Sequence, residues 1–168
     1  NFMRIIYTLL AVLAVSLSSV STSSAETLEL KYDGFQIWLS CEFRSPVMYA
    51  YKAKRDAGNF KRESSFYKDT DIPKRCQQLS TRSYSKKLSN GYGYDSGHQV
   101  PANHFDYSRN AIHQTNFMTN ILPQAAKMNR GAMYQTEEII ECYRDIDDLL
   151  VMGGPIWRGD TSNDFFVK

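Results

Sequence analysis

The sequence has few cysteines, few histidines and no long apolar run. It contains three cysteines and three histidines in 168 residues, and their spacing matches no zinc motif such as H-E-x-x-H or paired cysteines. The apolar stretch at residues 5–15 is shorter than the roughly 18 residues that a membrane-spanning helix needs. No repeat, low-complexity tract or linker-like segment interrupts the remainder. These absences argue against a zinc hydrolase, an integral membrane protein and a repeat architecture.

The N-terminal segment is typical of a secretory signal peptide. Arg4 precedes the apolar residues 5–15, and the serine-rich stretch that follows ends at Ala25. A short apolar region followed by small residues is the pattern of a cleaved export signal. We therefore expect cleavage between Ala25 and Glu26, and a mature chain that is secreted or periplasmic without stable membrane association.

The remainder, residues 26–168, has the length of one domain. The chain carries 11 Tyr, 9 Phe and 2 Trp, a content that favours a packed globule over a disordered chain. Its three cysteines, Cys41, Cys76 and Cys142, all follow the expected cleavage site, so an oxidising compartment permits one disulfide and leaves one thiol over. Spacing does not choose the pair; we favour Cys41 with Cys76 because both precede the segments that carry the chemistry.

The net charge of +2 conceals two regions of opposite sign. Residues 52–87 carry eleven Lys or Arg against four Asp or Glu, a local balance of +7, whereas residues 137–148 carry one Arg against six acidic residues, a balance of −5. The basic region would attract a polyanion. Either run by itself is more often a solvated face that keeps a protein soluble.

Apolar periodicity predicts the main elements. Residues 28–52 alternate loosely and indicate two or three strands, whereas residues 53–90 have no sustained period and indicate long loops with short elements. The glycines of residues 91–102 indicate a strand end and a turn.

The second half of the chain predicts a strand, a helix and a strand. Residues 115–121 are compatible with a strand, residues 127–147 repeat at helical spacing, and residues 149–152 resemble a buried strand. The expected fold class is α+β, with a central antiparallel or mixed sheet and a helix on at least one face.

Three separated stretches carry a recognisable pattern. They are Asp95-Ser96-Gly97-His98-Gln99-Val100-Pro101-Ala102-Asn103-His104, then Thr119-Asn120-Ile121-Leu122-Pro123-Gln124, then Asn129-Arg130-Gly131-Ala132 followed by Glu137. In order and separation they resemble the D-R-G-H, S-N-I-x-P-Q and N-x-G-x-W signatures of the DNA/RNA non-specific endonucleases, also called ββα-metal or His-Me finger nucleases, which include endonuclease G. The resemblance covers about residues 91–157 and ends at Val151-Met152-Gly153-Gly154-Pro155, which looks like the V-x-T-G-P strand of that family.

The resemblance implies a ββα-metal core, with a mainly antiparallel central sheet flanked by helices. Family members usually continue for several more elements beyond the Gly-Gly-Pro strand. We therefore expect either a fragment, incomplete at its C-terminal end, or a sheet that is completed differently.

The resemblance also implies roles for individual residues. His98 would be the general base, because imidazole can take a proton from water near neutral pH. Asn129 would be the only direct protein ligand of a Mg²⁺ or Mn²⁺ ion that otherwise keeps its waters. Glu137, about two helical turns further on, would accept hydrogen bonds from those waters, with Glu138 or Glu141 as alternatives.

Other residues would support the site. Asn120 would form hydrogen bonds near His98 or to the substrate, and Asp95 would brace the turn. Arg62 would bind a substrate phosphate and stabilise the charge that develops on phosphorus, with Arg75 and Arg82 as substitutes.

The sequence departs from the family pattern at two positions. Ser96 stands where the family has a phosphate-binding arginine, so one cation is missing. We expect weaker catalysis, or compensation by Arg130, Arg109 or Lys127. Met133 stands where a tryptophan is common, which should affect packing more than chemistry.

The implied activity is exported, sugar-non-specific hydrolysis of phosphodiester bonds in DNA and RNA. Phosphate contacts position a strand without reading its bases, so little sequence preference is expected. One alternative is a degenerate, non-catalytic nucleic-acid-binding member of the same family, and another is an interaction module that uses the fold only as a scaffold. A homodimer and a dedicated protein inhibitor also stay open.

Other histidines and aromatic residues have simpler interpretations. His104 and His113 could join His98 as metal ligands, but structural or surface roles are more common for such residues. A further group of aromatic side chains flanks the predicted turn and could stack on bases, although rim or core packing is the more common role; it comprises Tyr92, Tyr94, Phe105 and Tyr107.

Overall fold

The computed structural model describes residues 26–78, 80–81, 84 and 93–157. The expected signal peptide and Arg82 lie outside these described residues. Within them, no helix combines the length and the apolar character that crossing a membrane requires.

A four-stranded antiparallel sheet is built mainly from the first third of the chain. Its strands are β1 (Thr27–Lys31), β2 (Phe35–Ser40), β3 (Ser45–Ala53) and β6 (Leu149–Gly153), in the order β1-β2-β3-β6. Gly34 connects β1 to β2 with a φ of 90°, a left-handed conformation that glycine adopts without steric cost. The two or three strands predicted for residues 28–52 are therefore three.

A second, two-stranded antiparallel sheet carries the first motif. β4 (Tyr94–His98) pairs with β5 (Ile121–Ala125), and His98 lies opposite Ile121. Gly97 allows the two strands to pack closely, because a Cβ there would lie 2.2 Å from Cδ of Gln124. This pairing places His98 at the end of β4.

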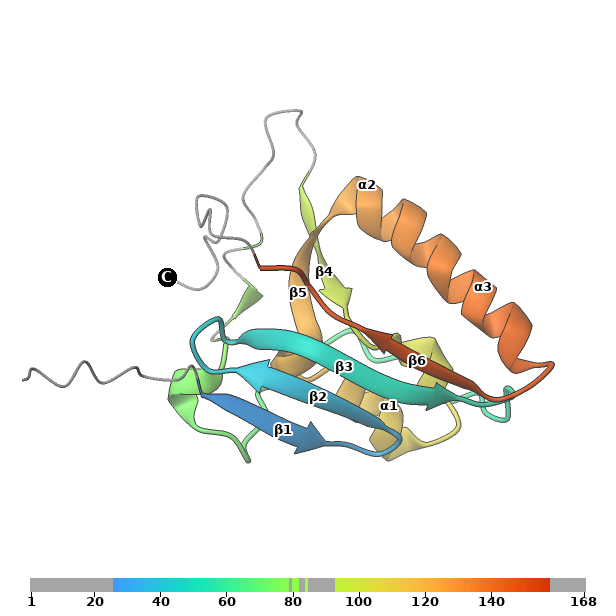
Figure 1. Ribbon diagram of the computed structural model, residues 1–168, viewed down its shortest axis with the longest axis horizontal. Coiled ribbons are helices and arrows are strands. Elements are labelled where there is room, and N and C mark those ends of the chain that lie inside the picture. The colour runs from blue at the N-terminus through green and yellow to red at the C-terminus, as the bar shows by residue number, and fades with distance from the viewer. Residues whose placement is uncertain (1–25, 79, 82–83, 85–92, 158–168) are drawn as a thin grey trace, which may run out of the picture.

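Short helical elements connect the strands. They are η1 (Lys74–Cys76), η3 (Ala102–Phe105), α1 (Arg109–Thr115), η4 (Met118–Asn120), α2 (Ala126–Met128), η5 (Asn129–Met133) and α3 (Tyr134–Arg144). Ser108 caps α1, because its Oγ accepts the N–H of Ala111 at 3.3 Å. The last three elements follow one another directly, with a π-helical turn in the middle. They form the helix predicted for residues 127–147, except that it ends at Arg144, three residues earlier than predicted. Figure 1 shows α3 running along the β6 side of the four-stranded sheet.

The hydrophobic core joins the sheet to the segment around α1. Ile37 and Leu39 of β2 are fully buried and belong to one cluster with Val100, Phe105 and Ala111. The disulfide between Cys41 and Cys76 fastens the loop that contains η1 to the end of β2, which confirms the favoured pairing. Cys142 is free and exposed.

The prediction of a strand at residues 115–121 is wrong. Thr115 ends α1, a 3₁₀ turn follows, and the strand begins only at Ile121. The side chain of Asn120 donates to the carbonyl of Thr115 at 2.8 Å, and this contact closes a turn where an extended chain would diverge. α1 was not predicted at all, because seven residues are too few to show a helical period.

The strand predicted for residues 149–152 is present, but it is not buried. Leu150 and Met152 are 74% and 58% exposed. In the described part of the chain, β6 has a partner strand on one side only, namely β3. An apolar run indicates a strand without indicating how many of its faces are covered.

The architecture as a whole agrees with the prediction. It is α+β with antiparallel sheets, and β4, β5 and the helix that follows form a unit consistent with a ββα-metal core. Residues 54–73 contain no named helix or strand, as expected for the basic stretch. This loop brings Arg62 to the end of β4.

Candidate functional site

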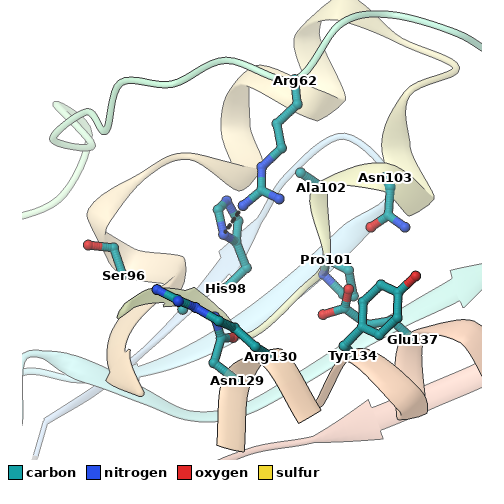
Figure 2. A pocket seen from close by; sticks show the side chains of 11 residues that line it. Arg62, Ser96, His98, Pro101, Ala102, Asn103, Asn129, Arg130, Tyr134 and Glu137 are labelled. Carbon is teal, nitrogen blue, oxygen red and sulfur yellow. Dashed lines mark hydrogen bonds between the residues drawn. The ribbon is translucent and has the colours of Figure 1, made fainter. Parts of the chain in front are cut away.

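A pocket of about 350 Å³ opens at the end of β4, between the loop that carries Arg62 and the helix that begins after β5 (Figure 2). Four residues singled out in the sequence line it, namely Arg62, His98, Asn129 and Glu137. They come from positions up to 75 residues apart, so only the fold brings them together.

His98 is buried, and both of its ring nitrogens have partners. Nε2 lies 2.7 Å from Oδ1 of Asn116, and Nδ1 lies 3.1 Å from Nη2 of Arg62. Asn116 uses its amide nitrogen to donate to the backbone carbonyl of Glu63 at 3.1 Å, so Oδ1 is its acceptor and Nε2 of His98 carries the proton. The lone pair is therefore on Nδ1, the nitrogen that faces Arg62 (Figure 2).

The surroundings of His98 keep its ring neutral. Burial lowers the pKa of His98 to about 4, the charge of Arg62 acts in the same direction, and the hydrogen bond with Asn116 opposes both. A neutral imidazole at neutral pH can accept a proton. Because Arg62 contributes to the lowered pKa, its departure from Nδ1 would make His98 a stronger base.

Asn129 is held by a carboxylate on β4. Its Nδ2 donates to Asp95 Oδ2 at 3.0 Å, and Arg130 binds the same carboxylate through Nε at 2.9 Å and Nη2 at 2.7 Å. The hydrogen bond from Arg130 is the main reason that the pKa of Asp95 lies below its usual range. With Nδ2 engaged, Oδ1 is the amide atom left to coordinate a ligand. Asp95 thus orients Asn129, a more definite role than bracing a turn.

Glu137 is the acidic residue of α3 that lines the pocket. Burial raises its pKa. Of the two alternatives, Glu138 forms a hydrogen bond with Tyr134 and Glu141 accepts one from Asn103. Neither alternative lines the pocket, so the structure favours Glu137 among the three.

The donor atoms of the pocket suit a hard divalent cation. Asn129 Oδ1 and the Glu137 carboxylate are oxygen donors, which Mg²⁺ and Mn²⁺ prefer. Elsewhere in the described residues, one cluster of metal-binding side chains occurs, Glu26 with Cys41 and Cys76, and its cysteines are consumed by the disulfide.

The other histidines have partners of their own. Nδ1 of His104 lies 2.9 Å from the hydroxyl of Tyr51, and Nδ1 of His113 lies 3.0 Å from a carboxylate oxygen of Glu63. Neither lines the pocket. These contacts agree with structural roles.

Asn120 lies beneath the site and does not line the pocket. It is 0% exposed, its Oδ1 accepts the N–H of Val100 at 2.8 Å, and its Nδ2 donates to the carbonyl of Val100 at 2.9 Å. Its own carbonyl accepts the N–H of Gln99 at 2.9 Å. Of the two roles considered for Asn120, this geometry fits support of the chain just after His98, because a fully buried amide does not reach a substrate.

The substitute cations lie in different places. Arg75 forms an exposed ion pair with Glu26 at 2.8 Å, and neither Arg109 nor Lys127 lines the pocket. Arg130 does line it, together with Ser96. Arg130 is therefore the described cation best placed to offset the arginine that Ser96 replaces.

Asn116 is the residue that sequence reasoning missed. It caps the C-terminal end of α1, and there it meets both His98 and the loop that carries Arg62. The only signal in the sequence is its position four residues before Asn120, which is not specific. Its role depends on a contact across 18 residues that no local pattern predicts.

A comparison with family models supports the motif assignment. The model described as DNA/RNA non-specific endonuclease matches residues 15–166, most of the chain. A search of curated proteins finds no match. The matched range includes the three motif stretches and every residue that lines the pocket. The chain therefore belongs to the DNA/RNA non-specific endonuclease family.

Proposed function

We propose that this protein hydrolyses phosphodiester bonds in DNA and RNA, with His98 as general base and a divalent cation held by Asn129. Family membership supports nuclease activity in general. The observation that carries the finer proposal is the geometry of His98, whose Nε2 meets Asn116 and whose Nδ1 is left as the acceptor at a pocket that Asn129 and Glu137 also line. We also propose export, with loss of residues 1–25.

Arg62 would have two successive partners. In the free protein its Nη2 donates to Nδ1 of His98 at 3.1 Å, so a water molecule cannot use that lone pair. A phosphate oxygen carries charge and is a stronger acceptor than a neutral imidazole. Substrate would therefore draw Arg62 onto the backbone, after which Nδ1 can take a proton from the attacking water as its oxygen bonds to phosphorus. The bond from phosphorus to the leaving oxygen would break, the leaving oxygen would take a proton from solvent, and Arg62 would stabilise the negative charge on the non-bridging oxygens.

The residues on the helix side would hold the cation. Mg²⁺ or Mn²⁺, when bound, supplies Lewis-acid stabilisation to the phosphoryl and leaving oxygens. Asn129 would coordinate it through Oδ1, while Asp95 keeps the amide in that orientation. Glu137 would accept hydrogen bonds from the hydration shell.

Recognition in this arrangement is mainly of the backbone. Arg62 and Arg130 are the charged donors at the pocket, and arginine matches the geometry of phosphate. Backbone contacts carry no sequence information. We therefore expect cleavage of unrelated DNA and RNA sequences, and a single tight consensus would contradict this expectation.

The test is digestion of plasmid DNA and of RNA by protein lacking residues 1–25, with Mg²⁺, with a chelator, and with His98→Ala at matched folding. We expect metal-dependent cutting that disappears in His98→Ala. Intact substrate with salt-sensitive binding would instead identify a non-catalytic nucleic-acid-binding protein. If the protein neither cuts nor binds nucleic acid, it is an interaction module.

A further inference from the structure

We infer that Phe60 and Arg109 form a stacking subsite for an unpaired nucleobase beside the phosphate that Arg62 binds. The inference rests on the proposed nucleic-acid substrate and adds a binding element outside the catalytic pocket. Neither Phe60 nor Arg109 lines that pocket.

The ring of Phe60 is presented to solvent together with a cation. Phe60 is 41% exposed, and the guanidinium carbon of Arg109 lies 5.2 Å from the centroid of its ring. An exposed aromatic ring on a basic surface can stack on any base, because every base has a π-face, and an arginine adds a cation–π contribution. Lys61, the next residue along the chain, is also exposed and adds positive charge for the backbone.

The loop that carries Phe60 is held in place. The N–H of Phe60 donates to the carbonyl of Asp106 at 2.9 Å. Gly58 lies so close to the same turn that a Cβ there would be 2.2 Å from Asp106 O, so the loop lies flat against the chain just before α1, where Arg109 is the first residue. A loop whose backbone is already held in the free protein can present an aromatic ring without first being ordered.

The position of Phe60 along the chain relates it to the reacting phosphate. Phe60 and Arg62 are two residues apart, so their Cα atoms are separated by at most about 7 Å. Both side chains extend beyond their Cα atoms, so this limit places the two groups in one region of the surface without fixing the distance between them. A base stacked on Phe60 would therefore belong to a nucleotide within a few positions of the phosphate at Arg62.

The subsite predicts a preference for single strands. Phe60 can stack on a base only where that base is unpaired or terminal, so a duplex would not use the ring. Removal of an aromatic platform weakens single-strand binding by about tenfold or more. Simple rim packing of Arg109 on Phe60 predicts no such difference between single-stranded and duplex substrates.

The experiment measures binding of a fluorescein-labelled single-stranded oligonucleotide, and of its duplex, by anisotropy. The parent protein carries His98→Ala to prevent cleavage. We expect Phe60→Leu to weaken single-strand binding about tenfold and to leave duplex binding unchanged, and we expect Phe60→Trp to restore single-strand binding. Tyr143→Leu is the matched control, since Tyr143 is a 57% exposed aromatic residue on the acidic helix α3 and should change neither.

Three results would overturn the inference. They are unchanged single-strand binding in Phe60→Leu, an equal loss for single strand and duplex, and failure of Phe60→Trp to restore binding. If the unmutated protein cuts nucleic acid while Phe60→Leu binds normally, the subsite alone is wrong. If the parent does not bind and the unmutated protein does not cut, both the subsite and the proposed function are wrong.

Discussion

The two sides of the pocket are completed to different degrees in the free protein. On the His98 side, both ring nitrogens have partners, and the ring is almost fully buried. On the Asn129 side, the amide nitrogen is fixed by Asp95, while the amide oxygen and the Glu137 carboxylate are the groups that would receive a cation. The orientation of the His98 ring is thus fixed before substrate or ion arrives, although Arg62 still occupies Nδ1, whereas the proposed cation side would be completed only by the ion.

The backbone is also more firmly held on the His98 side of the pocket than on the Asn129 side. His98 ends a strand paired with β5, and Asn120 fastens the residues just after it. Asn129 begins the π-helical turn η5, none of whose residues is buried. Single π-turns inside helices occur often at functional sites, and here the first two residues of the turn, Asn129 and Arg130, both donate to Asp95.

The largest expected effect is a loss of catalysis on removal of the proposed base, with the cation site left intact. His98→Ala should lower kcat/KM by about 10² to 10⁴-fold, because proton transfer by a positioned side chain contributes that much. Its affinity for Mn²⁺, followed by electron paramagnetic resonance of the free ion, should not change. A parallel loss of Mn²⁺ affinity would show that the two sides are not independent.

The next largest expected effect is weaker cation binding on removal of Asp95 or Asn129, with the His98 ring unaffected. Asp95→Ala should weaken Mn²⁺ binding by about 10 to 100-fold, because residues that orient a ligand contribute that much to metal affinity, and Asn129→Ala should weaken it further. The ring nitrogens of His98 should keep their protonation in both variants. Glu42→Ala, which removes an exposed carboxylate between β2 and β3, is the control and should bind Mn²⁺ normally.

A smaller expected effect is a change in the pH dependence of activity when Asn116, the partner of His98 Nε2, is replaced. Asn116→Asp places a negative charge at Nε2 of His98, which favours the imidazolium form and raises the pKa of His98. The base is active only above that pKa, so the acid limb of the kcat/KM profile should move to higher pH by about one unit or more. Asn116→Ala should lower activity about tenfold near neutral pH without moving the acid limb to higher pH, because it removes a hydrogen bond that raises the pKa of His98. If the pH profile of Asn116→Asp is unchanged, Asn116 does not influence the protonation of His98.

The smallest effect concerns stability. Burial lowers the pKa of His98 and of His104 to about 4 in the folded protein, against about 6.5 in an unfolded chain. Between these values the unfolded state binds more protons, so this contribution to stability is complete above about pH 6.5 and is lost as pH falls towards 4. Urea denaturation across this range should show the decline, and His98→Ala should make it shallower. An equal slope in both proteins would mean that His98 is not neutral when folded.

The sequence predicted those parts of the molecule that depend on local patterns. Alternation in residues 28–52 indicated the meander, and helical spacing indicated the long helix after β5. The motif resemblance pointed to His98, Asn129 and Glu137, and all three line one pocket. Arg62 was placed across a variable loop, and it also lies at this pocket.

The remaining features depend on contacts that are distant in sequence. Asn116 meets His98 through the end of a helix too short to show a period, and the exposure of β6 depends on how many partners the strand has. The contact of Arg62 with Nδ1 spans 36 residues. No pattern in the sequence indicates that Arg62, which was expected to bind a substrate phosphate, contacts Nδ1 of His98 in the free protein.

The central claim is that His98 is neutral, with its lone pair on Nδ1, before any ion or substrate binds. Nitrogen-15 spectra of the imidazole rings, recorded between about pH 5 and 8 with and without Mg²⁺, test it most directly. We expect a protonated Nε2 and an unprotonated Nδ1 throughout this range. A His98 ring that titrates near its ordinary pKa of about 6.5, or that carries its proton on Nδ1, would contradict it.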